Sequence, residues 1–165
     1  MFMSEPDGMT GQDLGNDETI IDWHSNGQEG QFDASLEEVL HIITHAGYAN
    51  AYPEVFGEEG GSELCDAMDV ARGGQFFDIP REYPEDAWYH YNDETCDYSC
   101  MATEYIYWAL TSLLGAQENR GDDISHEWNL NTPQLLVATD YAIFDLLTNE
   151  EYAFPTVLPD GGYMD

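Results

Sequence analysis

Two histidines and one glutamate have the residue types and the spacing to bind a metal ion. His41 and His45 are four residues apart, so on a helix they lie one above the other and can both offer an imidazole nitrogen to one ion. Glu104 is the one charged residue in the apolar and aromatic segment 101–114. A buried carboxylate without a partner is costly, and a chain with so few basic residues favours a metal ion or a histidine as that partner. We therefore predict that these three residues lie close together and hold a divalent transition metal.

The alternatives to this metal site follow from the placement of the same residues on their helices. On a helical wheel at about 100° per residue, the histidines share one side with Glu37 and Glu38, so they are predicted to face a cleft or solvent. The opposite, apolar side is predicted to face the core and consists of Leu36, Val39, Leu40, Ile43 and Ala46. A solvent-facing histidine pair is one alternative. For Glu104 the alternative is a partly solvated place in the first helical turn, where the helix dipole favours a carboxylate.

The charge of the chain limits the partners that it can bind. Asp and Glu number 34 against three Arg and no Lys, which gives a formal net charge of -31 at pH 7. Nucleic acids and anionic membranes are bound mainly through Lys and Arg, so we exclude both as partners. No apolar run approaches the length of a membrane span. Like charges across the surface repel unless cations screen them, which predicts a saline or calcium-rich medium.

The composition predicts a folded chain. Of its 165 residues, 42% are hydrophobic and 13% aromatic, more than a disordered acidic segment carries. We predict an α+β, predominantly helical fold with about four helices and a short strand region near the N-terminus. Residues 1–18 are interpreted as a flexible acidic lead or extended arm, and residues 19–165 as a single globular domain.

The expected elements follow from capping residues and helix breakers. The pattern favours a strand at 19–24, a long loop at 75–95, and helices at 35–46, 62–72, 101–114 and 133–147. Ser35 and Glu38 are spaced as a capping box at the start of the first helix, and Gly47 is predicted to end it.

Cysteines and acidic loops supply further candidate sites. The spacing of Cys65, Cys96 and Cys100 does not complete a tetrahedral zinc site, and two of the three can form a disulfide in an oxidising compartment, with the pairing left open. Two acidic loops can offer oxygen ligands to calcium, although neither has the spacing of an EF-hand. The calcium candidates are Asp93, Glu94, Asp97, Asp122 and Asp123. Solvated acidic surface is the alternative for all five.

Six aromatic residues crowd into the loop that follows the second predicted helix. These interface candidates are Phe76, Phe77, Tyr83, Trp88, Tyr89 and Tyr91. If they are exposed, they form a patch suited to another protein or to a second copy of the chain, since Tyr and Trp concentrate at interfaces. The alternative is that their rings fold back onto the core.

A histidine pair followed by a glutamate that opens a second helix resembles the zinc-binding layout of gluzincin metallopeptidases, in particular catalytic domains like that of anthrax lethal factor. The run 104–107 matches the family's Glu-aromatic-aromatic beginning, Tyr98 precedes it where the family places a tyrosine, and residues 132–136 resemble the family's closing helix. The resemblance covers residues 33–147. It implies a zincin-like domain in which His41, His45 and Glu104 are zinc ligands.

One position departs from the pattern of that family. HExxH peptidases place a general-base glutamate directly after the first histidine, where it activates the zinc-bound water. This chain has Ile42 there, and isoleucine cannot accept a proton. Glu38 lies one turn earlier and is the candidate base if the chain is active, but it approaches from the wrong end of the motif. We therefore expect a degenerate zincin-like domain without peptidase chemistry.

Three functional hypotheses remain open at this point. The first is a non-enzymatic extracellular or surface domain that is stabilised by zinc or calcium and acts through protein contacts or self-assembly. The second is an active metal-dependent hydrolase with an unusual general base. In the third, the acidity reflects the cytoplasm of a salt-in halophile and says nothing about the role of the protein. A lysine-free composition favours export.

Overall fold

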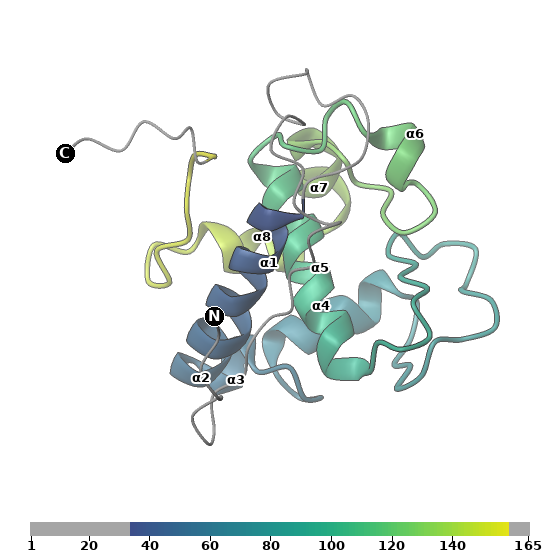
Figure 1. Cartoon of the computed structure of the whole chain (residues 1–165), viewed down its shortest axis with the longest axis horizontal. Helices are drawn as coiled ribbons and strands as arrows, with labels where there is room; N and C mark the ends of the chain where they lie inside the picture. The colour runs from purple at the N-terminus through teal and green to yellow at the C-terminus, as the bar shows by residue number, and fades with distance from the viewer. Residues whose placement is uncertain (1–33, 159–165) are drawn as a thin grey trace, which may run out of the picture.

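The computed structural model describes residues 34–158, in which nearly all regular structure is helical (Figure 1). In chain order the elements are α1 (Ser35–Ile42), the π-helix η1 (Ile43–Tyr48), α2 (Ala49–Ala51), α3 (Pro53–Phe56), α4 (Glu63–Ala71), α5 (Tyr98–Leu113), α6 (Gly121–Ile124), α7 (Pro133–Thr139) and α8 (Tyr141–Thr148). Within these residues, strand-like pairing is limited to one isolated bridge between Tyr89 and Trp128. The predominantly helical prediction is confirmed. The predicted strand at 19–24 and the lead at 1–18 lie outside the described residues.

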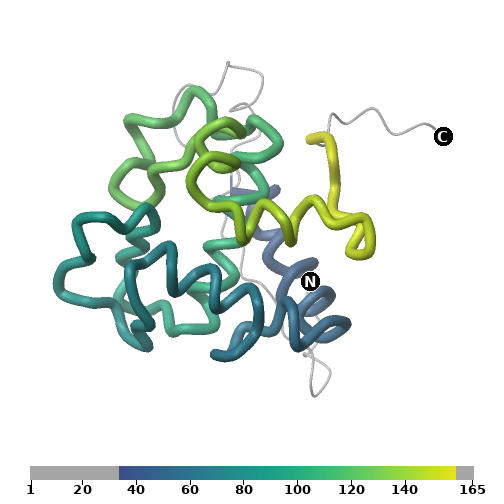
Figure 2. The backbone as a smooth tube through the Cα atoms, turned by 180° about the vertical axis from the view of Figure 1, so that it is seen from behind, coloured from purple at the N-terminus to yellow at the C-terminus, as the bar shows by residue number. Residues whose placement is uncertain are grey.

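Helix α5 lies at the centre of the fold and contacts α1, η1, α4, α7 and α8 (Figures 1 and 2). Its sequence is apolar or aromatic nearly all round, which is the pattern of a helix covered on every side. The helix begins three residues before the predicted start, because the Asp97 side chain accepts a hydrogen bond from the Cys100 amide at 2.9 Å and so caps it. None of the helices among residues 34–158 combines the length and apolar character needed to cross a bilayer.

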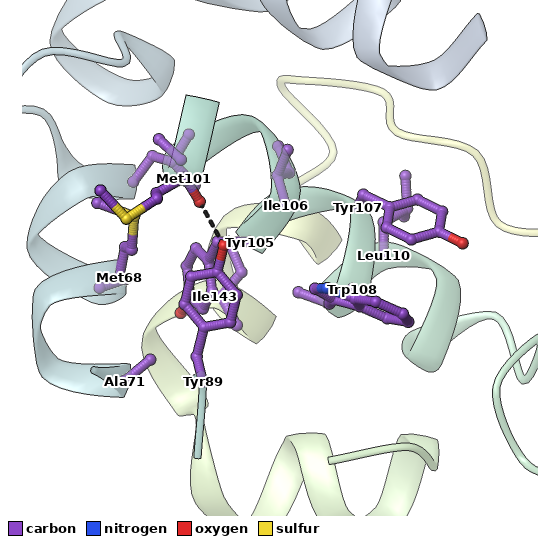
Figure 3. Packing of buried hydrophobic residues seen from close by; sticks show 14 of the residues in the cluster. Met68, Ala71, Tyr89, Met101, Tyr105, Ile106, Tyr107, Trp108, Leu110 and Ile143 are labelled. Carbon is purple, nitrogen blue, oxygen red and sulfur yellow. Dashed lines mark hydrogen bonds between the residues drawn. The ribbon is translucent and has the colours of Figure 1, made fainter. Parts of the chain in front are cut away.

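The core around α5 is rich in tyrosine and tryptophan (Figure 3). Met68 and Ala71 of α4 and Ile143 of α8 are buried against it. A buried tyrosine needs a partner for its hydroxyl, and Tyr89 donates to the Met101 carbonyl at 2.7 Å, the bond drawn in Figure 3. The ring centroids of Tyr89 and Tyr105 are also 5.4 Å apart. The centre of the molecule is therefore held by polar contacts as well as by apolar burial.

Two of the predicted helix boundaries are explained by side-chain caps. Ser62 accepts from the Cys65 amide at the start of α4, and Gly73, with φ of +75°, follows its end, in agreement with the predicted helix at 62–72. The predicted helix at 133–147 is instead divided into α7 and α8 at Asp140. This residue leaves the helical conformation, with ψ of 70°, and its carboxylate caps α8 through the Ile143 amide.

The first helix does not stop at Gly47, contrary to the prediction. The chain continues through that residue in the wider turns of η1, and the helical path ends at Tyr52, the residue before Pro53. The capping-box prediction is also wrong, since Ser35 is already helical and no side chain caps α1 at Ala34. In η1, Tyr48 stacks on Phe154 with ring centroids 4.1 Å apart, which brings the C-terminal segment back against this helix (Figure 2).

Candidate metal centre

His41 on α1 and Glu104 on α5 face each other across the contact between these two helices. Their Nε2 and Oε2 atoms are 3.5 Å apart, and only 3% and 12% of the two side chains are exposed. Glu37 lies one turn before His41 on the same face of α1. One ligand atom from each of these three residues lies within 4.8 Å of the others. Within residues 34–158 this is the set of His, Cys, Asp and Glu side chains placed to share an ion, and we call it the Glu37–His41–Glu104 cluster.

The imidazole of His41 is positioned as a metal-binding histidine is. Its Nε2 atom is buried and makes no hydrogen bond within the described residues. On the other side of the ring, Nδ1 lies 3.8 Å from Oε2 of Glu38. The imidazole and the ring of Tyr107 pack in a T-shaped arrangement, with their centroids 5.6 Å apart. Metal-bound histidines usually place a carboxylate or carbonyl beside the nitrogen that does not bind the metal. The ring therefore has a carboxylate beside Nδ1, and its Nε2 atom lies 3.5 Å from Glu104.

Burial makes the ionised forms of all three residues unfavourable. It raises the pKa of Glu104 to about 9, helped by the negative charges of Glu37, Glu38 and Glu127. Burial likewise raises the pKa of Glu37 to about 7, against a hydrogen bond from Tyr107.

The histidine of the cluster is shifted in the opposite direction. Burial lowers the pKa of His41 to about 4, so at neutral pH the imidazole is neutral and its nitrogen can bind a metal. A divalent ion would lower the pKa of both carboxyl groups, because an opposite charge favours the ionised form. The cluster thus has two carboxyl groups whose ionised forms a cation would stabilise, and one neutral imidazole whose nitrogen can bind that cation.

The orientation of α1 corrects the prediction from the helical wheel. The polar side of the helix faces α5, and His41 is 2% exposed, whereas Leu36, Val39 and Ile43 on the apolar side are 49%, 52% and 48% exposed. Because α5 presents Glu104 and Tyr107 toward α1, the polar side finds its partners there. The wheel placed Glu37 and His41 correctly on one side of α1 and assigned the wrong side to the interior.

His45 does not belong to the cluster. Its Nδ1 atom makes a short contact with Oε2 of Glu58, and Glu58 also accepts hydrogen bonds from Ser99 at 3.2 Å and from Thr103 at 2.8 Å. The π-helix begins at Ile43, between the two histidines. Its wider turn changes the angle between residues four apart, so the two imidazoles no longer stack over one another.

Glu37 takes the place in the cluster that the sequence prediction gave to His45. The signal for it was present, because Glu37 precedes His41 by four residues and the wheel placed both on one side of the helix. No separate motif marked it as a ligand. Glu38, the candidate base, approaches Nδ1 of His41 at 3.8 Å, which is the side of the ring turned away from Glu104. Ile42 is 45% exposed.

The calcium candidates have other roles or lie on the surface. Asp93 accepts two hydrogen bonds from Thr95, from the amide and the hydroxyl, and these lower the pKa of its carboxyl group. Asp97 caps α5. The remaining candidates, Glu94, Asp122 and Asp123, are exposed. None of the five joins a three-ligand set among the described residues, and calcium binding stays a prediction.

The structure shows how the three cysteines pair. Cys96 and Cys100 form a disulfide that ties the end of the loop to the first turn of α5, and Cys65 is a buried free thiol.

Of the six interface candidates, only Phe77 is mostly exposed, at 61%, and Tyr89 is fully buried. The other four, Phe76, Tyr83, Trp88 and Tyr91, are half-buried. Arg72, 0% exposed, lies against the rings of Phe76 and Tyr83. The burial of most of these rings favours the alternative, in which they fold back onto the core. A role of these residues in an interface stays a prediction.

Comparisons of the chain with protein-family models, with curated proteins and with solved structures find no match. The resemblance to gluzincin peptidases stays a prediction.

Proposed function

We propose that this chain is a non-enzymatic, metal-stabilised acidic domain in which Glu37, His41 and Glu104 bind one divalent transition-metal ion. The ion would join α1 to α5, the central helix of the fold. Imidazole and carboxylate ligands without a thiolate suit zinc and its neighbours in the first transition series. Zinc, the metal expected from the sequence, is therefore the first ion to test.

The observation that carries this proposal is the buried Nε2 atom of His41. A polar atom that is removed from water and lacks a hydrogen bond is destabilising. This one lies 3.5 Å from Glu104, in a cluster whose two carboxyl groups have pKa values raised by burial. A bound cation would satisfy the nitrogen and both acids together. It would also stabilise the ionised forms of both acids, which burial disfavours.

A structural role fits these residues better than hydrolysis does. Three protein ligands leave one coordination position open, as in catalytic zinc sites, but hydrolysis also needs a base within reach of the metal-bound water. Ile42 cannot provide one, and Glu38 lies beside Nδ1 of His41 instead of beside Nε2. Hydrolysis that a chelator abolishes would favour the alternative, an active enzyme.

The setting of this domain is part of the proposal. The disulfide between Cys96 and Cys100 supports an oxidising, extracellular or surface location, which agrees with the lysine-free, acidic composition. Such a domain would act through contacts with other proteins or with copies of itself. The exposed Phe77 remains available for such contacts.

Metal binding can be tested on the full chain with isosteric variants. After treatment with a chelator and dialysis, the wild type is expected to bind one equivalent of zinc in 150 mM NaCl with excess calcium. At this ionic strength the screening length is about 8 Å, so nonspecific attraction of zinc to the acidic surface is suppressed. Glu104→Gln and Glu37→Gln should each weaken zinc binding by about tenfold or more. Isothermal titration with elemental analysis gives both the stoichiometry and the affinity.

The matched control is Glu127→Gln. This variant removes the same charge from the same neighbourhood, since Glu127 raises the pKa of Glu104 but lies outside the cluster. It should retain stoichiometric zinc. A wild type without stoichiometric zinc, or an equal loss of affinity in Glu127→Gln, would contradict the proposed site.

A further inference from the structure

The outer side of α1 and the start of η1 is an apolar surface without a partner among residues 34–158. It consists of Leu36, Val39, Ile42 and Ile43, each between 45% and 52% exposed. Single exposed apolar residues are ordinary on a protein surface, but four on one side of a short helix form a contiguous patch of the kind that marks an interaction site. We call these four residues the α1 outer face.

We propose that residues 20–23 of the same chain pack on the α1 outer face. This segment, Ile20-Ile21-Asp22-Trp23, has three large apolar side chains within four positions, and it lies closer to α1 along the chain than Met1-Phe2-Met3, the other such run in residues 1–33. It is joined to α1 through residues 24–33, which can span at most about 33 Å when extended. The α1 helix is only about 12 Å long, so the whole outer face is within reach of the segment.

The charge of the protein favours this occupant over a second copy. Each copy carries a formal net charge of -31, and two such surfaces repel each other at any distance shorter than the screening length. A segment of the same chain can pack on this face without bringing a second highly charged copy close to it. Its covalent connection also keeps it at an effective concentration of about millimolar, a level that a separate copy would not reach in dilute solution.

This docking gives α1 two partners on opposite sides. The inner side presents Glu37 and His41 to α5, and the outer side would be covered by residues 20–23. The inference goes beyond the proposed metal binding and does not depend on it, because none of its observations involves the Glu37–His41–Glu104 cluster. A docked segment would hold α1 against α5 whether or not an ion is present.

Hydrogen exchange on the metal-free full chain tests the inference. In the wild type, amides within residues 20–23 are expected to exchange at least about tenfold more slowly than an unprotected peptide. Val39→Asp, which places a charge in the α1 outer face, should remove this protection. The matched control is Val70→Asp on α4, an apolar residue that is 64% exposed and lies outside the α1 outer face; this variant should keep the protection.

A second variant addresses the possibility that Val39→Asp unfolds α1. Trp23→Ala changes the other side of the contact and should increase the exchange of the amides of α1 while circular dichroism stays unchanged. Unprotected residues 20–23 in the wild type, or protection that survives both Val39→Asp and Trp23→Ala, would overturn the inference. Protection that appears only as protein concentration rises, together with a dimer in sedimentation, would overturn it in favour of a second copy.

Discussion

His41 and Glu104 lie 3.5 Å apart across the α1–α5 contact, but they are not an ion pair at neutral pH. Burial lowers the pKa of His41 to about 4 and raises the pKa of Glu104 to about 9, so the imidazole and the carboxylic acid are both neutral between those values. Their distance alone would suggest a salt bridge. Burial, which favours the neutral form of both groups, decides against it.

The metal-free protein should lose stability as pH rises from about 6.5 to 9. Glu104 and Glu37 have folded-state pKa values raised from 4.5 to about 9 and about 7. In this window the folded state binds more protons than the unfolded state, so stability falls with pH. His41, whose pKa is lowered from 6.5, acts in the opposite sense only below pH 6.5. The free energy of unfolding in urea should fall by about 1 kcal/mol per pH unit.

The control for this pH dependence is Glu104→Gln, which removes the group with the largest shift. The other ionisable groups near the cluster, Glu38, Tyr91, Tyr107, Arg120 and Glu127, are unchanged in this variant. Its stability should vary much less between pH 7 and 9. An equally steep fall in the wild type and in Glu104→Gln would mean that the slope has another origin.

Zinc binding should strengthen with pH and should release protons. A carboxylic acid must lose its proton to bind the ion, and Glu104, with a pKa of about 9, is protonated at pH 7. Affinity measured between pH 6 and 7.5 is expected to rise about tenfold per pH unit for each proton displaced. Calorimetry in buffers of different ionisation enthalpy counts these protons. A pH-independent affinity with no proton release would rule out ligation by Glu104.

Asp140 should be one of the residues on which stability depends most. Its buried carboxylate accepts hydrogen bonds from Trp88 Nε1 at 2.8 Å and from the Tyr105 hydroxyl at 2.6 Å, and it caps α8. Asp140→Ala leaves two donors without this acceptor and removes a cap, which costs about 3 kcal/mol or more. Asp145→Ala, on the exposed side of α8, is the control and should change stability by less than about 0.5 kcal/mol. Equal effects in denaturant titrations would refute this role.

The thermal midpoint should rise with salt and with calcium. A formal net charge of -31 makes repulsion across the surface a general destabilising effect, and screening relieves it. Melting curves from low salt to molar NaCl measure the screening. Millimolar calcium at matched ionic strength separates specific binding, which stabilises by mass action, from screening. A thermal midpoint that does not move in either series would show that repulsion among the surface charges does not limit the stability of the protein.

Much of the helical framework could be predicted from local signals. Ser62 and Gly73 mark the ends of α4, and the apolar character of residues 101–114 identified α5 as the central helix. Such caps and breakers act within a few residues, so a sequence displays them directly. The grouping of Glu37 with His41 on one side of α1 was likewise a local consequence of helical spacing.

The errors came from contacts between distant segments. The buried carboxylate of Asp140, held by Trp88 and Tyr105, divides one predicted helix into two. The π-helix that begins at Ile43 turns His45 toward Glu58. The inward side of α1 depends on what α5 presents to it, and a helical wheel contains no information about that partner. In this chain the polar side of α1 is the one that faces the neighbouring helix.

Crystals of the zinc-loaded full chain, measured with anomalous scattering at the zinc edge, test the central claim most directly. The account predicts one strong peak between α1 and α5, about 2.0 to 2.2 Å from Nε2 of His41 and from a carboxylate oxygen of Glu37 and of Glu104. Glu104→Gln crystals treated in the same way should lack that peak. A zinc-loaded crystal with no peak there, or with its ordered zinc at His45 and Glu58 instead, would contradict the account.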